Sequence, residues 1–202
     1  MRCKMIKFEK VSRFANTEIK LPTRATMGSA GYDLTVAEDV VILPYDKLMH
    51  ELNFACNSKF AIVKPMERQD VQVGERNISV ECFSLEDIAK ATKETKIKPT
   101  LVSTGVKAYM PKDVYLELAV RSSCPLKYWL VMANGVGIID SDYVDNPQNE
   151  GEIFLQLINF GPVPIILEKG DVIGQGIFKP YLTTDSDSTN TERSGGFGST
   201  NA

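Results

Sequence analysis

Short runs of alternating apolar and polar residues, each ended by proline or glycine, most restrict how this chain can fold. Between residues 99 and 182 the breaks include Pro99, Gly105, Pro111 and Pro125. Such spacing suits many short strands and leaves little room for helices. The sequence therefore predicts an all-β domain, a sandwich or barrel, over residues 1–182.

The segment from about 48 to 98 interrupts this pattern, because it mixes strand-like runs with a helix signal. Ser84 followed by Asp87 resembles a helix N-cap with an acid in the first turn, and apolar residues then fall on one helical face. We expect one short helix near residues 85–95. Because strand-like runs flank the segment on both sides, it is predicted to be an insertion into the β domain.

The last residues, 183–202, are rich in Ser, Thr, Gly and Asp and cannot bury enough surface to order themselves alone. A solvated tail is the simpler interpretation. However, Arg193 and Phe197 stand among glycines, which would give a phosphate-binding fork and a stacking ring on a hinge. A flexible C-terminal arm that closes as a lid is the alternative.

Charge and composition exclude several classes of partner. The net charge is −3 and the isoelectric point is near 5.3, so the surface as a whole would not attract nucleic acid. The only histidine is His50, and four cysteines lie far apart without a CxxC pair, which argues against a histidine or cysteine metal site. No apolar run approaches the length of a membrane span. We expect a soluble cytoplasmic protein that contacts neither nucleic acid nor membrane.

The stretch Met132–Tyr143, MANGVGIIDSDY, is an apolar, glycine-bent segment that ends on two acids. Gly135 and Gly137 permit the backbone to bend or to approach a ligand closely. One interpretation is a strand that presents Asp140 to a pocket. The other is a hairpin whose acids only form a local turn.

Three further patches carry chemically useful groups, although each is weak evidence alone. Asp33 follows a glycine-rich turn, Arg121-Ser122-Ser123 follows an apolar strand, and Gln175 lies beyond the turn at 170–171. Asp33 could simply face solvent, and an Arg-Ser-Ser sequence is usually a surface turn. Together, phosphate donors and an acid that orients water would suit hydrolysis of a phosphoanhydride.

Five motifs, in order along the chain, resemble those of the homotrimeric dUTP pyrophosphatase (dUTPase) family. They are AGYDL at 30–34, RSS at 121–123, NGVGIIDSDY at 134–143, GDVIGQ at 170–175 and RSGGFGST at 193–200. The sequences DNPQNEG and GQGIF look most like forms encoded by bacteriophages or prophages.

This resemblance implies a fold, an assembly and an activity. The fold would be a distorted jelly-roll β-barrel, and the assembly a homotrimer whose active sites lie between subunits. The activity would be hydrolysis of dUTP to dUMP and diphosphate, with Mg²⁺, in the cytoplasm of a bacterial or phage-infected cell. The arm would fold over the bound nucleotide.

The resemblance also assigns roles to residues of the third motif. Asp140 would be the general base that activates the water attacking the α-phosphorus. Tyr143 would lie under the deoxyribose and leave no room for a 2′-hydroxyl. Asn134 and the strand backbone up to Ile139 would read the uracil edge.

The other motifs would bind the triphosphate and its metal. Arg121, Ser122, Ser123 and Gln175 resemble the phosphate and metal-water shell of the family, and Asp33 and Gln175 would reach Mg²⁺ through water. In the arm, Arg193 would bind the γ-phosphate and Phe197 would stack on the uracil, with Gly198, Ser199 and Thr200 completing the closed lid.

The chain departs from the family pattern in three places. Arg193 and Phe197 are closer together than usual, Val144–Asn149 are extra residues after the third motif, and the 48–98 segment has no counterpart in minimal members. Two other functions therefore stay open. One is a dCTP deaminase-like enzyme of the same fold, and the other is a nucleotide-dependent regulatory module that binds a protein partner through the insertion.

Overall fold

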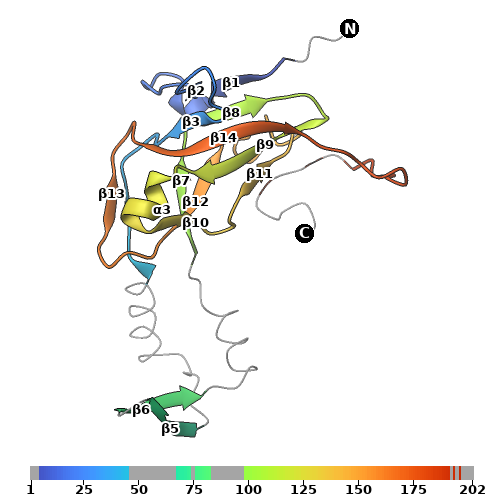
Figure 1. The fold of residues 1–202 in the computed structure, drawn as a ribbon. Coiled ribbons are helices and arrows are strands. Elements are labelled where there is room, and N and C mark those ends of the chain that lie inside the picture. The colour runs from blue at the N-terminus through green and yellow to red at the C-terminus, as the bar shows by residue number, and fades with distance from the viewer. Residues whose placement is uncertain are drawn as a thin grey trace. The chain divides into compact units, whose positions relative to one another are not determined.

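The computed structural model describes residues 5–45, 67–73, 76–82, 98–191, 193 and 196. They belong to two units: residues 1–44 with 99–202, and residues 45–98. In the second unit, strands β5 (Glu67–Val73) and β6 (Arg76–Cys82) form an antiparallel hairpin (Figure 1). The helix predicted near 85–95 lies outside the described residues.

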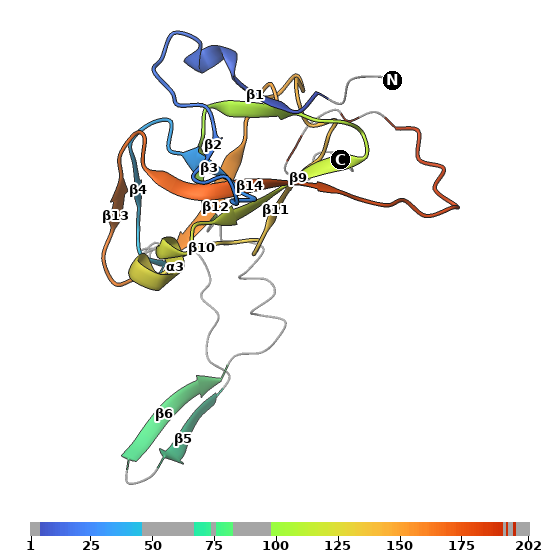
Figure 2. The ribbon, with the colours of Figure 1, turned by 45° about the horizontal axis from the view of Figure 1, so that its top comes forward.

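The larger sheet of the first unit has five strands in the order β11-β9-β14-β3-β2. The long strand β14 pairs with β9 along one edge and with β3 along the other, and Figure 2 shows it running between them. The bounds are β2 Thr23–Arg24, β3 Tyr32–Thr35, β9 Val114–Val120, β11 Gly137–Ile139 and β14 Val172–Pro180.

A second sheet has three strands in the order β10-β12-β7, and two strand pairs, β1-β8 and β13-β4, complete the unit. All of these pairings are antiparallel. The bounds are β1 Lys7–Lys10, β4 Val40–Ile42, β7 Thr100–Ser103, β8 Val106–Tyr109, β10 Leu130–Met132, β12 Phe154–Asn159 and β13 Ile165–Leu167.

The core lies where the two sheets meet. Leu116 and Leu118 of β9 and Leu155 and Leu157 of β12 belong to one cluster of buried side chains, because alternate residues of each strand face inward. Gly174 of β14 marks a close approach, since a Cβ there would lie 2.5 Å from Leu155 Cδ2. The prediction of an all-β fold is confirmed.

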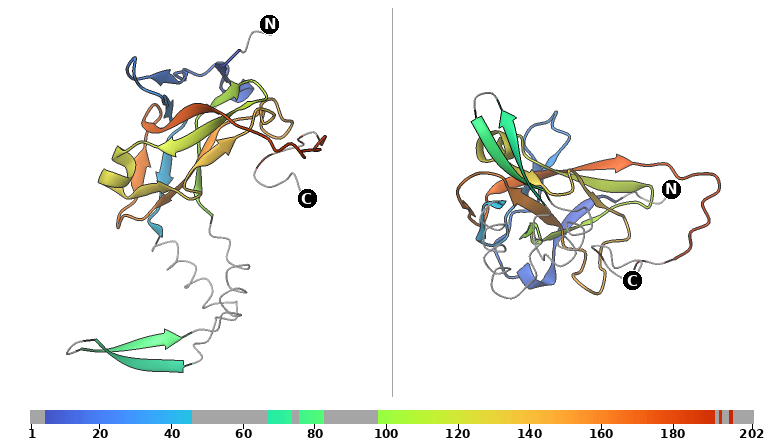
Figure 3. Two further views of the ribbon diagram at one scale, coloured as in Figure 1. Left: turned by 45° about the vertical axis from the view of Figure 1, so that its right-hand side comes forward. Right: turned by 90° about the horizontal axis from the view of Figure 1, so that it is seen from below.

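Helical structure in the described residues is limited to the 3₁₀ turn η1 (Ser12–Phe14) and the short helix α3 (Ser123–Tyr128), with one helical residue at 45. Figure 3 shows α3 beside β13 and β4. The sequence did not predict α3, because Pro125 looked like a stop, whereas proline fits the first turn of a helix, where its missing N–H is not needed. Among the described residues, no helix is long and apolar enough to cross a membrane.

Candidate active site

Three of the motif residues come together at one end of the five-stranded sheet. Asp33 of β3 lies directly opposite Gln175 of β14, so both side chains are on the same face. Arg121, which follows β9, places its Nε 4.0 Å from Asp33 Oδ1. Its own backbone N–H donates to the Ile173 carbonyl at 3.1 Å. The sheet therefore gathers an acid, an amide and a guanidinium from segments that are far apart in the sequence.

Gly31 makes room for the side chain of Gln175. A Cβ at position 31 would lie 2.3 Å from Gln175 Oε1, closer than real contacts allow, and a tight 3.0 Å from Gln175 Cβ. A side chain at position 31 would therefore displace the Gln175 amide from its place beside Asp33.

The two serines of the RSS motif lie at the start of α3. Ser122 is the N-cap residue, but its hydroxyl makes no capping hydrogen bond, and its side chain is exposed. Cys124 anchors the turn, because it is buried, its N–H donates to Arg121 O at 2.9 Å and its Sγ donates to Ile173 O at 3.2 Å. Burial raises the pKa of the Cys124 thiol. This turn holds Arg121 beside Asp33 and leaves Ser122 exposed at the residue that follows.

The third motif forms an exposed turn that connects β10 in the three-stranded sheet to β11 in the five-stranded sheet. Gly135 has a φ of +70°, and its N–H donates to Met132 O at 3.1 Å. Asn134 is exposed at this turn. A Cβ at position 137 would lie 3.1 Å from Leu118 Cβ, so β9 would crowd any side chain at this position. The predicted glycine bend is thus a turn that keeps the Asn134 edge open.

Asp140 follows β11 directly and contacts the arm. Its side chain is 50% exposed, and its Oδ2 accepts a short hydrogen bond from Arg193 Nη2. Arg193 Nε also donates to Asp142 Oδ1 at 2.8 Å. Burial alone would lower the pKa of Arg193, but the hydrogen bonds and charges of Asp142 and Asp140 raise it. The arm arginine is therefore held by both acids of the third motif.

Tyr143 is buried at the end of the same motif, with 6% of its surface exposed. Its hydroxyl donates to Glu152 O at 3.0 Å and accepts from Asn149 Nδ2 at 2.7 Å. Burial raises the pKa of this phenol, although the Asn149 hydrogen bond opposes the shift. From the arm, Gly196 lies against the ring, since a Cβ there would be 2.6 Å from Tyr143 Cε2.

Asp140 and Arg121 lie at opposite ends of β9 within one chain. Ile139, the residue before Asp140, pairs with Leu116, and Arg121 is five residues farther along the strand. At the rise of an extended strand this separation is about 17 Å. Figures 1 and 2 show the same arrangement, with α3 beyond one end of β9 and β11 toward the other. A single chain thus forms two clusters, one around Asp33, Arg121 and Gln175, and one around Asp140, Tyr143 and Arg193.

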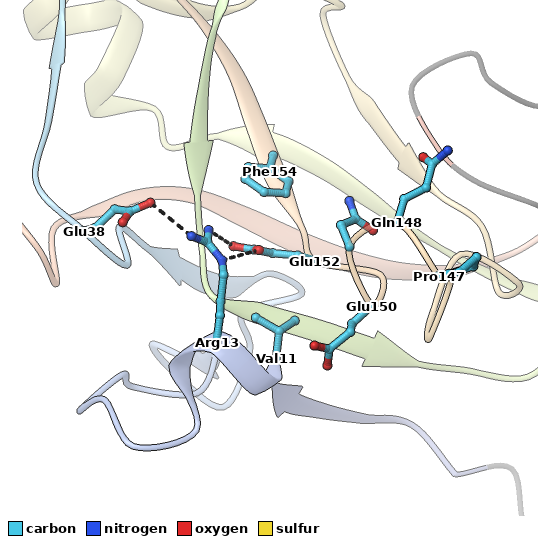
Figure 4. A pocket seen from close by; sticks show the side chains of 9 residues that line it. Val11, Arg13, Glu38, Pro147, Gln148, Glu150, Glu152 and Phe154 are labelled. Carbon is cyan, nitrogen blue, oxygen red and sulfur yellow. Dashed lines mark hydrogen bonds and ion pairs between the residues drawn. The ribbon is translucent and has the colours of Figure 1, made fainter.

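A separate hollow of about 550 Å³ lies beside the loop after Tyr143 (Figure 4). Arg13 crosses it and donates to Glu152 from Nε and Nη2 at 2.8 and 2.7 Å, with Glu38 3.5 Å away. Because this guanidinium is already paired with two carboxylates, we assign the hollow a structural role. It is lined by Val11, Arg13, Glu38, Pro147, Gln148, Asn149, Glu150, Glu152 and Phe154, none of which the motifs predicted.

Four predicted residues of the arm lie outside the described residues, and the contact of Asn149 with Tyr143 was not predicted. Phe197, Gly198, Ser199 and Thr200 lie outside the described residues. Asn149 was seen only as part of an extra loop, and nothing in that sequence shows that its amide reaches Tyr143.

Comparison with known proteins adds independent information about the whole chain. The family model described as dUTPase matches residues 87–201. The deoxyuridine 5′-triphosphate nucleotidohydrolase of Lactococcus lactis subsp. lactis (strain IL1403) is 36% identical over 197 residues, covering 96% of this chain and 97% of that protein. The corresponding protein of Clostridium novyi (strain NT) is 35% identical over 134 residues, which cover 64% of this chain and 87% of that one.

Solved structures agree with these sequence matches. The crystal structure of dUTPase from Streptococcus mutans has a TM-score of 0.59 and 32% identity, and covers 89% of this chain and 98% of that chain. A dUTPase from phage phi11 of S. aureus has a TM-score of 0.54 at 16% identity, covers 94% of this chain and 99% of that chain, and shows likeness of fold alone. With a family match over more than half of its residues and a relative aligned over nearly its full length, this chain belongs to the dUTPase family.

Proposed function

We propose that this protein hydrolyses dUTP to dUMP and diphosphate. The observation that carries the proposal is the pairing of Asp33 with Gln175 beside Arg121, which gathers phosphate-binding and metal-facing groups from three motifs. The second cluster supplies an exposed carboxylate, Asp140, next to a buried aromatic ring, Tyr143. Family membership adds to this argument, because the relatives named above carry this activity in their names.

In the proposed reaction, Asp140 accepts a proton from water as the water oxygen bonds to the α-phosphorus. The bond from that phosphorus to the bridging oxygen breaks, and diphosphate leaves. Arg193 occupies Asp140 Oδ2, so in the proposed reaction Arg193 exchanges this carboxylate oxygen for a phosphate oxygen and leaves Oδ2 to the water. Substrate binding and activation of the base are thereby coupled through one guanidinium.

The remaining groups bind and select the nucleotide. Asn134 lies on the exposed turn before β11, and it and the backbone up to Ile139 would pair with uracil. Tyr143 would support the deoxyribose. Arg121, Ser122, Ser123 and Gln175 would bind phosphate oxygens, and in the arm Phe197, Gly198 and Ser199 would cover the base.

The donor set fits Mg²⁺ held through water and phosphate. Asp33 and Gln175 offer oxygen atoms on one face of the sheet. In the described part of the chain, no three His, Cys, Asp or Glu side chains form a cage for a metal. Mg²⁺ commonly keeps several waters and binds substrate phosphates, so it does not need such a cage. When bound, the ion would neutralise charge on the triphosphate.

We also propose that a complete site contains residues of more than one chain. The support is the roughly 17 Å along β9 between the Asp140 cluster and the Arg121 cluster, which a single small reaction centre does not span. A head-to-tail contact that repeats and closes makes a ring. The homotrimer is the ring that the family resemblance implies.

The direct test is diphosphate release from dUTP, dCTP, dTTP, dATP and dGTP, with Mg²⁺ and with EDTA, and ammonia release from dCTP. We expect fast, Mg²⁺-dependent release from dUTP alone. Ammonia from dCTP would instead support a deaminase, and absence of dUTP turnover would refute the proposal.

A further inference from the structure

The loop Val144–Gly151 contains the extra residues Val144–Asn149 that follow the third motif, and it is fixed by hydrogen bonds of its own. Asn146 is buried, and its Nδ2 donates to Tyr143 O at 2.8 Å and to Asn149 Oδ1 at 2.7 Å. Its Oδ1 accepts from the backbone N–H groups of Gln148 and Asn149 at 3.0 and 3.2 Å. One buried amide thus sets the conformation of the loop.

Residues outside the loop bind its Asp145 and Glu150 side chains through ion pairs and hydrogen bonds. Asp145 and Glu150 have φ values of +57° and +59°, a conformation that side chains other than glycine rarely adopt. Asp145 accepts hydrogen bonds from Lys107 and from Tyr109, and Glu150 accepts one from the N–H of Ser12 at 3.1 Å. A strained backbone persists only where its surroundings fix it, so these contacts stabilise one loop conformation.

Asn149 connects this fixed loop to the ring of Tyr143. Its Oδ1 accepts from Asn146 and from Gly151 N at 3.1 Å, which orients the amide. Its Nδ2 then donates to the Tyr143 hydroxyl, which itself donates to Glu152 O. A phenol with one fixed donor and one fixed acceptor cannot shift along its own axis without losing both hydrogen bonds.

We propose that Asn149 is a positioning residue for sugar selection, because it holds the Tyr143 ring at a depth that accepts deoxyribose and excludes a 2′-hydroxyl. The inference rests on the proposed function, in which that ring lies under the sugar. The Tyr143 ring can exclude the 2′-hydroxyl of a ribonucleotide only if the ring cannot move away by about 1 Å. The hydrogen bonds that hold the phenol hydroxyl therefore contribute to the preference for deoxyribose. Gly196 lies against the Tyr143 ring and limits its movement toward the arm. The ring could therefore move only toward Asn149.

The variant Asn149→Asp tests the inference with a minimal change. It keeps an oxygen for Asn146 and Gly151 but replaces the donor that faces Tyr143 with an acceptor. We expect the ratio of kcat/KM for dUTP to kcat/KM for UTP to fall about tenfold, since the Tyr143 hydroxyl has one proton and can then keep only one of its two hydrogen bonds. UTP hydrolysis should rise relative to dUTP hydrolysis.

A double-mutant cycle shows whether Asn149 acts through the hydroxyl. In Tyr143→Phe the hydroxyl is gone, so adding Asn149→Asp should change the dUTP to UTP ratio no further. A matched control is Asn159→Asp, because the Asn159 amide is buried and donates to Ile42 O and Val163 O in another loop. We expect this control to lower the melting temperature while the ratio is kept.

Three results would overturn the inference. They are an unchanged ratio in Asn149→Asp, an equal change in both backgrounds, or an equal change in Asn159→Asp. Calorimetry with non-hydrolysable imido analogues of dUTP and UTP distinguishes failure of the proposed function from failure of this inference alone. If the wild-type protein binds neither analogue, the proposed function fails and the inference with it. If it prefers the dUTP analogue and Asn149→Asp keeps that preference, only the inference fails.

Discussion

Arg193 and Asp140 are hydrogen-bonded to each other, Nη2 to Oδ2, although 53 residues separate them in the chain. In the proposed reaction each needs a different partner, a phosphate for Arg193 and water for Asp140. The contact therefore links closure of the arm to release of the base.

Replacing Arg193 with lysine should keep the charge but remove the fork that bonds to Asp140 and Asp142 at once. We expect kcat/KM for dUTP to fall roughly 10- to 100-fold, mostly through KM, because one ammonium cannot make two parallel bonds. Steady-state kinetics measure this loss. In the control, Arg24→Lys, the lost bonds are to Met27 O and Ser29 O on an exposed turn, and kinetics should not change. An Arg193→Lys enzyme with normal KM would contradict the phosphate role.

Replacing Gly196 with alanine should prevent the arm from lying against Tyr143, since the new Cβ would come within 2.6 Å of the ring. We expect kcat/KM to fall about tenfold, with no change in melting temperature, because the clash is confined to arm closure. Gly28→Ala is the matched control, as nothing lies within 4 Å of its Cβ position. Equal kinetics for the two variants would show that Gly196 does not approach Tyr143 during turnover.

Replacing Gly31 with alanine should displace the amide of Gln175 and weaken the cluster beside Asp33. We expect lower kcat/KM and a higher Mg²⁺ concentration for half-maximal rate. In a Gln175→Ala background the methyl group meets no amide, so Gly31→Ala should there have a much smaller effect. If Gly31→Ala lowers kcat/KM by the same factor in both backgrounds, its effect does not pass through the Gln175 amide.

The pair Lys107 and Asp145 should make stability depend on pH in acid. The hydrogen bond from Lys107, aided by Tyr109, holds the pKa of Asp145 below its ordinary value of 3.8. A depressed folded-state pKa stabilises the fold above the unfolded-state pKa, and this contribution is lost as pH falls through the folded-state value.

Asp145→Asn should therefore be less stable than the wild type at pH 7, by at most about 1 kcal/mol because Asp145 is half exposed. The difference should begin to shrink as pH falls toward 3.8 and vanish only below the lowered folded-state pKa. Urea unfolding at several pH values measures it, with the exposed Asp185→Asn as control. A difference that persists undiminished into acid would show that charge pairing is not its cause.

The sequence predicted the fold class because periodicity reports burial locally. Alternating residues in β9 place Leu116 and Leu118 in the core, and the breaks at Pro111 and Gly170 fall between strands. Helix α3 was missed because a proline suits both a chain break and a first helical turn, and local pattern does not separate the two.

The site was less accessible to sequence reasoning. The motifs named Asp33, Arg121 and Gln175, but their convergence depends on the register of β3, β14 and β9, a long-range property. The hydrogen bond from Asn149 to Tyr143 was not foreseen, because it depends on the exact loop path that Asn146 fixes. The separation of Asp140 from Arg121 likewise follows from strand pairing alone.

The most direct test of the whole account is complementation between two inactive variants, Asp140→Asn and Arg121→Ala. Each should bind into the assembly and hydrolyse almost no dUTP alone. If a site takes Asp140 from one chain and Arg121 from the next, a 1:1 mixture after subunit exchange should recover about one quarter of the wild-type rate. A mixture that exchanges subunits, shown by mass spectrometry, and stays inactive would contradict a site shared between chains.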